Sequence, residues 1–244
     1  IIRTIGVGGT LIDLGAGKGQ KAESFFNSLK PSSYLAIDFS IEYLKEAVTK
    51  LSGKYPHINV QCMGMDFSKK ILIPESISEN KRVFFYPGSS IGNFLTSEAL
   101  HLLRQIKDQA KGGGLLFGVD LMKEESILKL AYDDPLKITA AFNLNILNSV
   151  NSLLGSDFNI DQFDHKVIIN HNENRVELFI ETLEQVTISW PGNSRVLKKG
   201  ELIHTENSHK YTLKGISELL KDAGFLKTQI WTDSKDYFAV IYAQ

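Results

Sequence analysis

The sequence lacks the features of an extracellular, membrane-bound or nucleic-acid-binding protein. Its single cysteine, Cys62, has no partner for an internal disulfide, and no secretory signal is present. No apolar run approaches the ~20 residues that span a bilayer. Lysine and arginine number 27 against 28 acidic residues, so the formal charge of −1 offers no basic surface to a nucleic-acid backbone. We therefore expect a cytoplasmic chain that binds neither a membrane nor nucleic acid.

Several ligand motifs are missing as well. There is no internal repeat, no low-complexity tract, and no Gly-Lys-Ser/Thr of a phosphate-binding P-loop. His204 and His209 are five residues apart and outside any H-E-x-x-H context, so no metal site is expected. The chain is long enough to fold around a hydrophobic core. Its 244 residues, 43% of them hydrophobic, can form one large domain or two small ones.

Short apolar segments alternate with amphipathic segments through the first half of the chain. The pattern predicts strands at 10–15, 34–39, 58–63, 82–87 and 112–121, with helices at 20–29, 41–52 and 97–110. Apolar strands that alternate with helices are typical of a parallel sheet covered on both faces. We therefore expect an α/β fold with a Rossmann-like sheet.

The pattern changes after about residue 122. Residues 124–154 predict two helices joined at Asp133-Asp134-Pro135, with Pro135 in the first turn of the second helix. Residues 164–189 predict two strands joined at Asn172-Glu173-Asn174, and 200–212 a further extended segment. A helix at 213–224 and an antiparallel pair at 227–244 close the chain. This predicts an α+β domain, 123–208, inserted into an α/β domain formed by 1–122 and 209–244.

The first expected strand ends in a glycine-rich turn. Gly15 and Gly17 begin a G-x-G-x-G run, in which no Cβ separates the backbone from a ligand. Asp38, at the end of the second strand, follows at about the interval of an acid that accepts hydrogen bonds from ribose hydroxyls. Asp66 and Phe67 follow the third strand and could cover an adenine. This order suits S-adenosylmethionine (SAM) better than NAD, although glycines alone are equally common in structural turns.

The fourth expected strand ends in small and polar residues, "PGSSIGN", from Pro87 to Asn93. In an open α/β sheet this is the carboxyl edge, where ligands bind. Gly88 and Gly92 leave room there, and the Asn93 amide can both accept and donate a hydrogen bond without adding charge. The segment therefore predicts a site that holds a small polar ligand.

Four stretches together carry a resemblance to a known family: "LIDLGAGKGQK", "PGSSIGNF", "AYDDPLKITAAFNLNIL" and "IHTENSHKYT". Over nearly its whole length the chain resembles the histidine-specific, SAM-dependent methyltransferases of ergothioneine biosynthesis. That family also includes fungal N-methyltransferases that act on a prenylated tryptophan. The resemblance implies a class I methyltransferase sheet, SAM as cofactor, and an inserted domain that binds the substrate. It also implies methylation of the α-amino nitrogen of L-histidine, up to the trimethylated betaine. We expect a monomer acting on this small molecule.

The resemblance also implies roles for individual residues. Those assigned to the cofactor are Gly15, Gly17 and Lys21 in the loop, Asp38 at the ribose, and Asp66 and Phe67 at the adenine. Gly88 and Asn93 meet the α-amino and carboxylate end of the amino acid. Tyr132 reaches the same end, so Asn93 and Tyr132 are the catalytic candidates. Glu206 and Ser208 hold the imidazole ring.

Two departures from the family pattern bear on substrate. Leu178 lies near the side-chain pocket, where we expect methionine in the histidine enzymes. The family also has an N-terminal helical segment whose tyrosines close over the substrate. The present sequence starts at Ile1, too late to include that segment, and we expect one to precede it in the natural protein.

Other interpretations remain open at this point. Leu178 and Glu206 would decide between histidine, tryptophan and another amino acid. The chain could instead be a SAM-binding module without catalysis. Structural roles are also possible for Tyr132 in helix packing and for Asn93 in a turn, while Glu206 and Lys21 would be solvated charges. For Asp38 the structural alternative is a helix N-cap, a role that Ser40 can already fill.

Overall fold

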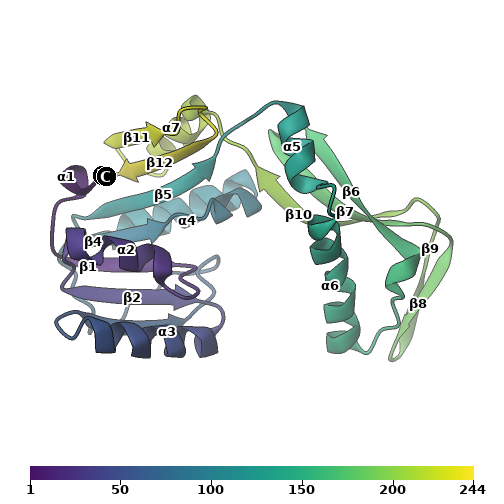
Figure 1. Cartoon of the computed structure of the whole chain (residues 1–244), viewed down its shortest axis with the longest axis horizontal. Coiled ribbons are helices and arrows are strands. Elements are labelled where there is room, and N and C mark those ends of the chain that lie inside the picture. Colours follow the sequence, from purple (N-terminus) through teal and green to yellow (C-terminus); the bar gives the residue numbers. More distant parts are fainter. The chain divides into compact units, whose positions relative to one another are not determined.

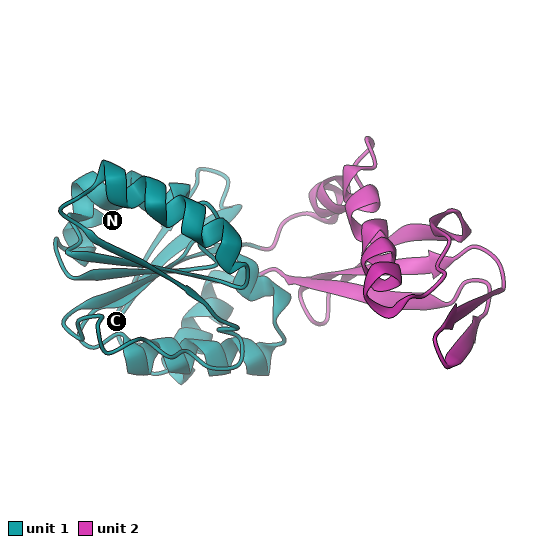
Figure 2. Ribbon diagram, turned by 90° about the horizontal axis from the view of Figure 1, so that it is seen from below, with its two compact units in different colours: residues 1–121, 211–244 teal, residues 122–210 magenta.

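The computed structural model describes residues 1–244 and divides into two compact units. Unit 1 comprises Ile1–Leu121 and Tyr211–Gln244, and unit 2 is the inserted segment Met122–Lys210 (Figure 2). The expected boundaries, 1–122 with 209–244 and 123–208, lie within two residues of these. Each unit has its own sheet and its own hydrophobic core.

Unit 1 is built on a seven-stranded sheet in the order β11-β12-β5-β4-β1-β2-β3 (Figure 1). Its strands are β1 (Thr10–Leu14), β2 (Ser33–Asp38), β3 (Asn59–Gly64), β4 (Arg82–Tyr86), β5 (Gly114–Asp120), β11 (Thr228–Thr232) and β12 (Phe238–Ala243). Its helices are α1 (Ile2–Ile5), α2 (Gln20–Leu29), α3 (Ile41–Lys54), α4 (Thr96–Gln109), α7 (Leu213–Asp222) and the short 3-10 helix η1 (Ser90–Asn93). Strands β1 to β5 are mutually parallel, and β12 runs antiparallel to both neighbours. The predicted Rossmann-like α/β sheet is confirmed.

The strands of unit 1 are continuous apolar runs because helices cover both faces of the sheet. Ile12 and Phe84 pack with α4 and α7 on one face. Their strand neighbours Leu11 and Phe85 pack with α2 and α3 on the other face. Burying each such side chain contributes about 1.5–3 kcal/mol, so both faces stabilise the frame that carries the loops.

Unit 2 is an α+β arrangement (Figure 1). It contains α5 (Glu125–Tyr132), α6 (Ile138–Leu154), the 3-10 helix η2 (Ile160–Gln162), β6 (Phe163–Asn170), β7 (Arg175–Thr182), β8 (Val186–Trp190), β9 (Asn193–Leu197) and β10 (Leu202–His209). An antiparallel sheet has the order β10-β7-β6, and β8-β9 form a separate hairpin. Helices α5 and α6 cover one face of the larger sheet, with Leu128 against Leu178 and Leu147 against Ile180.

Two local predictions in unit 2 are wrong. Pro135 is not in the first turn of α6, which begins three residues later. Instead the Asp134 carboxylate accepts the N–H groups of Ile138 (3.0 Å) and Thr139 (2.8 Å) and so starts the helix. The second predicted strand does not run on to residue 189, because Thr182 donates its N–H to the Glu201 carbonyl (3.0 Å) and the chain turns into the β8-β9 hairpin.

A β-bulge interrupts β10. Its pairing with β7 shifts register between His204 and Glu206, which leaves Thr205 as the extra residue. After the shift, Glu206 lies opposite Leu178 and Ser208 opposite Val176. Because directly opposed residues point to the same face of a sheet, Glu206 and Ser208 lie on the face that the helices cover. None of the helices in the structure combines the length and the apolar character that a membrane span requires.

Candidate functional site

The glycine loop between β1 and α2 is fastened to the end of β2. Gly15 (φ 68°) and Gly17 (φ 52°) adopt left-handed conformations that side chains other than glycine rarely take. The Gly17 N–H donates to Asp38 Oδ2 at 3.0 Å, and the Ser40 N–H to Oδ1 at 3.3 Å. The Ser40 side chain makes no capping hydrogen bond, so it does not fill the N-cap role expected of it. Asp38 therefore organises the loop, and its carboxylate keeps further lone pairs for a ligand.

A cavity of about 200 Å³ lies at the carboxyl ends of β1 and β4. It brings together three residues predicted from the sequence, Gly15, Lys21 and Gly88. A Cβ on Gly88 would lie 3.2 Å from Ser90 Oγ and 4.0 Å from Lys21 Nζ. The bare glycine thus keeps this space open beside a cationic group. The cavity suits the charged amino-acid portion of a cofactor such as SAM.

Asp13 also lines this cavity, and the sequence reasoning missed it. Its carboxyl group is only 3% exposed, and the Tyr34 hydroxyl donates to its Oδ2 at 2.8 Å. Burial raises the pKa of Asp13 to about 7, against the opposing effects of the Tyr34 hydrogen bond and the Lys21 charge. The available signal was an acidic residue inside the apolar run "LIDLG", directly before the glycine loop.

The two residues expected at the adenine have different surroundings. Asp66 is engaged in its own turn, where its Oδ1 accepts from the N–H (3.2 Å) and hydroxyl of Ser68, and Lys69 Nζ lies 3.1 Å from its Oδ2. The Ser68 hydroxyl is the main cause of a lowered Asp66 pKa. Phe67 packs edge-on against Tyr86, with ring centroids 5.8 Å apart, and Tyr86 lines the 200 Å³ cavity. The adenine contacts of both residues stay predictions.

The loop after β4 carries the candidate catalytic amide. Ser89 is left-handed (φ 58°), and its hydroxyl accepts the Asp120 N–H at 2.8 Å, which fastens the loop to the end of β5. Asn93 ends η1 with an exposed side chain that makes no hydrogen bond. The structure therefore leaves both its amide oxygen and its amide nitrogen available to a ligand.

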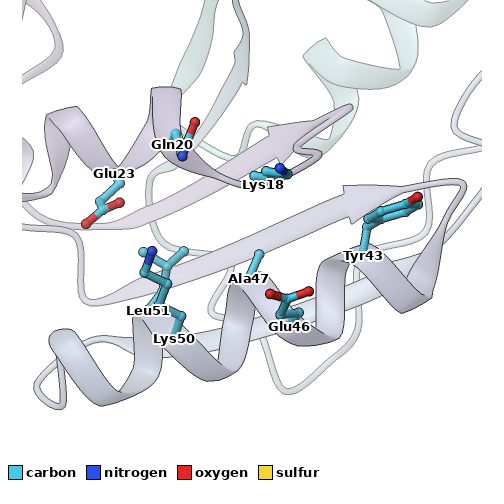
Figure 3. Close-up of a pocket in the computed structure, with 8 residues that line it drawn as sticks. All are labelled: Lys18, Gln20, Glu23, Tyr43, Glu46, Ala47, Lys50 and Leu51. Carbon is cyan, nitrogen blue, oxygen red and sulfur yellow. The ribbon is translucent and has the colours of Figure 1, made fainter.

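A larger cavity of about 310 Å³ lies between the start of α2 and α3. Figure 3 shows Lys18 of the glycine loop, Glu23 of α2, and Glu46 and Lys50 of α3 at this cavity. It contains none of the residues predicted to bind cofactor or substrate. Both cavities carry charges of both signs, and only the smaller one brings together residues that were predicted to bind a ligand.

Unit 2 contains four of the six residues predicted to bind the substrate, while Gly88 and Asn93 belong to unit 1. The hydroxyl oxygens of Tyr132, from the end of α5, and Ser208, from β10, lie 2.7 Å apart. Leu178 is 3% exposed and belongs to the apolar cluster against which the Tyr132 ring packs. Glu206 precedes Ser208 by two residues, so the two side chains leave the same face of β10. Tyr132 therefore both packs and presents its hydroxyl.

Glu206 is a half-buried carboxylate without a hydrogen-bond partner. Burial raises its pKa, and the Lys210 charge opposes that shift. A carboxylate removed from water without a donor is costly. The site is therefore prepared to receive an N–H group from a ligand.

Lys210 is a further residue that the sequence reasoning missed. It is 3% exposed, and its Nζ donates to the Tyr132 hydroxyl (2.7 Å) and to Ser208 Oγ (2.6 Å). The ammonium also lies 4.8 Å from the centroid of the Tyr132 ring. Its signal was the stretch "IHTENSHKYT", in which Lys210 stands two residues after Ser208.

The buried amide of Asn143 links the segments that carry Tyr132 and Glu206. Asn143 of α6, 6% exposed, donates from Nδ2 to the Phe179 carbonyl (3.0 Å) and to His165 Nδ1 (2.9 Å). Its Oδ1 accepts from the hydroxyl of the bulge residue Thr205 at 2.7 Å. With His165 Nδ1 as acceptor, Nε2–H donates to the Tyr132 carbonyl at 2.9 Å. Asn143 thus links the end of α5 to the bulge that carries Glu206.

Comparison with known proteins finds a family and several relatives that this chain resembles. A family profile described as histidine-specific methyltransferase, SAM-dependent, matches residues 1–244. The histidine N-alpha-methyltransferase of Mycolicibacterium smegmatis is 30% identical over 242 residues, which cover 96% of this chain and 74% of that protein. Ergothioneine biosynthesis protein 1 of Neurospora crassa is 28% identical, over 94% of this chain and 27% of that longer protein.

Solved structures agree on the fold. A SAM-dependent methyltransferase from Clostridium acetobutylicum superposes with a TM-score of 0.53 at 14% identity, over 98% of this chain and 85% of that one. At such low identity the likeness concerns the fold.

Proposed function

From the premise that this chain belongs to the family of histidine-specific, SAM-dependent methyltransferases, we propose that it methylates the α-amino nitrogen of L-histidine, up to the trimethylated betaine. The family makes the chain a SAM-dependent methyltransferase with a small-molecule substrate. The choice of histidine and of its α-nitrogen is our proposal. It also rests on the relative from Mycolicibacterium smegmatis, whose name states that activity.

The observation that carries histidine is the unpartnered Glu206 carboxylate beside the Ser208 hydroxyl. An imidazole offers an N–H donor and a second ring nitrogen, so it can satisfy both groups. An apolar aromatic side chain would leave the partly buried carboxylate unpaired, and such a loss discriminates strongly between substrates.

The residues of unit 1 fit SAM. When bound, SAM supplies a methyl group on a positively charged sulfur, which an aligned, unprotonated amine can accept. Gly15 and Lys21 border the 200 Å³ cavity and would hold the amino-acid portion of the cofactor. Asp38, already fixed by the Gly17 N–H, would accept from the ribose hydroxyls.

Asn93 of unit 1 and Tyr132 of unit 2 stay the catalytic candidates. Each can accept a hydrogen bond from an amine N–H, and neither side chain is an anion that would favour the protonated, unreactive ammonium. Alignment of this kind can contribute ~7–11 kcal/mol when reacting atoms are held close together. The small residues at Gly88 leave space for an amine that grows with each methyl group.

The test compares two amino acids on one substitution. Glu206→Ala should lower kcat/KM for histidine by about tenfold to a hundredfold, because a hydrogen bond to a charged group is worth roughly 1.5–3 kcal/mol. Activity on phenylalanine, whose ring has no N–H to donate to this carboxylate, should change little. Methylated products are measured by mass spectrometry with both amino acids at matched enzyme concentration.

Glu181→Ala is the matched control, since Glu181 lies on β7 of the same sheet, points to the other face and pairs with Lys166. It should leave both activities near those of the unchanged chain. Equal losses for histidine and phenylalanine in Glu206→Ala would refute the role given to this carboxylate.

A further inference from the structure

Lys210 has no part in the roles assigned above, yet it touches two of their hydroxyl groups. Its Nζ donates at 2.7 Å to Tyr132 and at 2.6 Å to Ser208, whose oxygens are themselves 2.7 Å apart. The three groups thus form a closed triangle of hydrogen bonds on the covered face of the unit 2 sheet. The side chain is 3% exposed, so this geometry is not a surface contact.

The triangle limits what the two hydroxyls can offer to a ligand. Together they have two protons and four lone pairs. Lys210 occupies one lone pair on each oxygen, and the bond between the oxygens uses one proton and one further lone pair. One proton and one lone pair remain, and they lie on different oxygens. Whenever Tyr132 presents an acceptor, Ser208 must present a donor, and the reverse holds as well.

We propose that Lys210 is a positioning residue that fixes the opposite hydrogen-bonding roles of Tyr132 and Ser208, so that the site accepts histidine with a neutral imidazole ring. The inference rests on the proposed function, in which Tyr132 accepts from the substrate amine. Ser208 then donates to an unprotonated ring nitrogen, while Glu206 accepts from the N–H of the other. An imidazolium ring, with two N–H groups, has no acceptor for Ser208.

Removal of Lys210 relaxes this restriction. Without the ammonium each oxygen regains a lone pair, so Ser208 can accept from a ring N–H while Tyr132 still accepts from the amine. The site would then admit both forms of the ring. The variant would thus lose its selectivity for the neutral imidazole ring over the protonated one. A lysine with a purely structural role would not control that selectivity.

Other groups near the pair also titrate or carry charge. They are Glu206 and Lys210 on β10, His165 on β6 and Tyr132 on α5. Their effect on binding, and that of the substrate amine, cancels when two ligands are compared at the same pH. L-histidine and 1,2,4-triazolylalanine form such a pair, because the triazole ring has the same shape and stays neutral in weak acid.

The experiment is calorimetry of both ligands with S-adenosylhomocysteine present, at about pH 8 and about pH 5.5. The free imidazole, with a pKa of ~6.5, is about tenfold depleted in its neutral form at the lower pH. The ratio of the two dissociation constants, histidine over triazolylalanine, should therefore rise about tenfold on acidification. In Lys210→Met the rise should fall below about threefold. Lys210→Gln keeps an uncharged amide donor on a shorter side chain, so its rise should lie between that of Lys210→Met and that of the unchanged chain.

Lys166→Met removes a lysine from the same sheet, where it pairs with Glu181, and should keep the full rise. A flat ratio in the unchanged chain would overturn the proposal, as would a full rise in Lys210→Met. Retained triazolylalanine binding at about pH 8 shows that unit 2, which carries both lysines, is folded in each variant. If the unchanged chain binds neither ligand at the higher pH, the proposed function fails together with this inference.

Discussion

At the scale of single residues, Asp13 stands out as a carboxyl group held inside a sheet. Burial raises its pKa from the ordinary 3.8 to about 7. The folded chain therefore binds this proton more tightly than the unfolded chain does. The contribution of Asp13 to stability is greatest below the unfolded pKa and is lost as the pH rises through the folded pKa.

Asp13→Asn should remove this loss. Three pKa units correspond to about 4 kcal/mol at most. As the pH rises from about 4 to about 8, the unfolding free energy of the variant should therefore increase by up to a few kcal/mol relative to that of the unchanged chain. An asparagine oxygen can still accept from Tyr34. Urea unfolding across this range measures the difference, with the exposed Asp161→Asn as control. A constant difference between Asp13→Asn and the unchanged chain would contradict the assignment.

The sequence predicted some site residues and missed others for a physical reason. Asp38 ends β2 and Asn93 lies in the loop that follows β4, and polar residues that follow an apolar run are visible from the sequence alone. Asp13 and Lys210 lie within runs that pack, and their surroundings depend on residues far along the chain, Tyr34 for one and Tyr132 for the other. No local spacing signals such partners.

At the scale of elements, the Asn143 network decides how α5, α6 and β10 meet. The amide joins the Thr205 bulge to His165, which in turn holds the Tyr132 carbonyl. The three hydrogen-bond partners of Asn143 come from three different strands, β6, β7 and β10. The network thus sets the positions of Tyr132 and Glu206 without contacting either side chain.

Asn143→Leu should therefore affect stability and binding together. The substitution keeps the volume but leaves buried polar groups unpaired, at about 1–3 kcal/mol for each. We expect a loss of roughly 3 kcal/mol in unfolding free energy and a higher KM for histidine. Urea unfolding and steady-state kinetics measure the two effects. Asn148→Leu, on the same helix and exposed, is the control, and equal losses in both variants would contradict this role.

Burial also explains which elements the sequence revealed. Strands β1, β2, β4 and β5 are buried along almost their whole length, and such strands are legible as apolar runs. The β8-β9 hairpin is half exposed and short. The predicted strand that ends at residue 189 covers most of β8, and no strand is predicted over β9. The bulge at Thr205 has no sequence pattern, because it arises from pairing with β7.

At the scale of the whole molecule, the two units divide the work. The residues assigned to SAM belong to unit 1, whereas Tyr132, Leu178, Glu206 and Ser208 belong to unit 2. Each unit has a separate hydrophobic core. A substitution that destabilises one core should therefore lower the affinity for one ligand more than the affinity for the other.

Leu147→Ala tests this division. Leu147 is 3% exposed in the core of unit 2, and its truncation should cost about 2–5 kcal/mol in the stability of that unit. Histidine affinity should fall, while calorimetry of S-adenosylhomocysteine should show little change. Leu102→Ala, in the core of unit 1, should lower S-adenosylhomocysteine affinity. A loss of S-adenosylhomocysteine affinity in Leu147→Ala as large as that in Leu102→Ala would contradict independent cores.

The most direct measurement of the central claim is transfer of an isotope-labelled methyl group from SAM to L-histidine, followed by NMR of the product. The account predicts that label appears on the α-nitrogen, in successive signals that end in a trimethylammonium group, and that Asn93→Ala with Tyr132→Phe abolishes it. Label on a ring nitrogen, or on another amino acid while histidine stays unlabelled, would contradict the account.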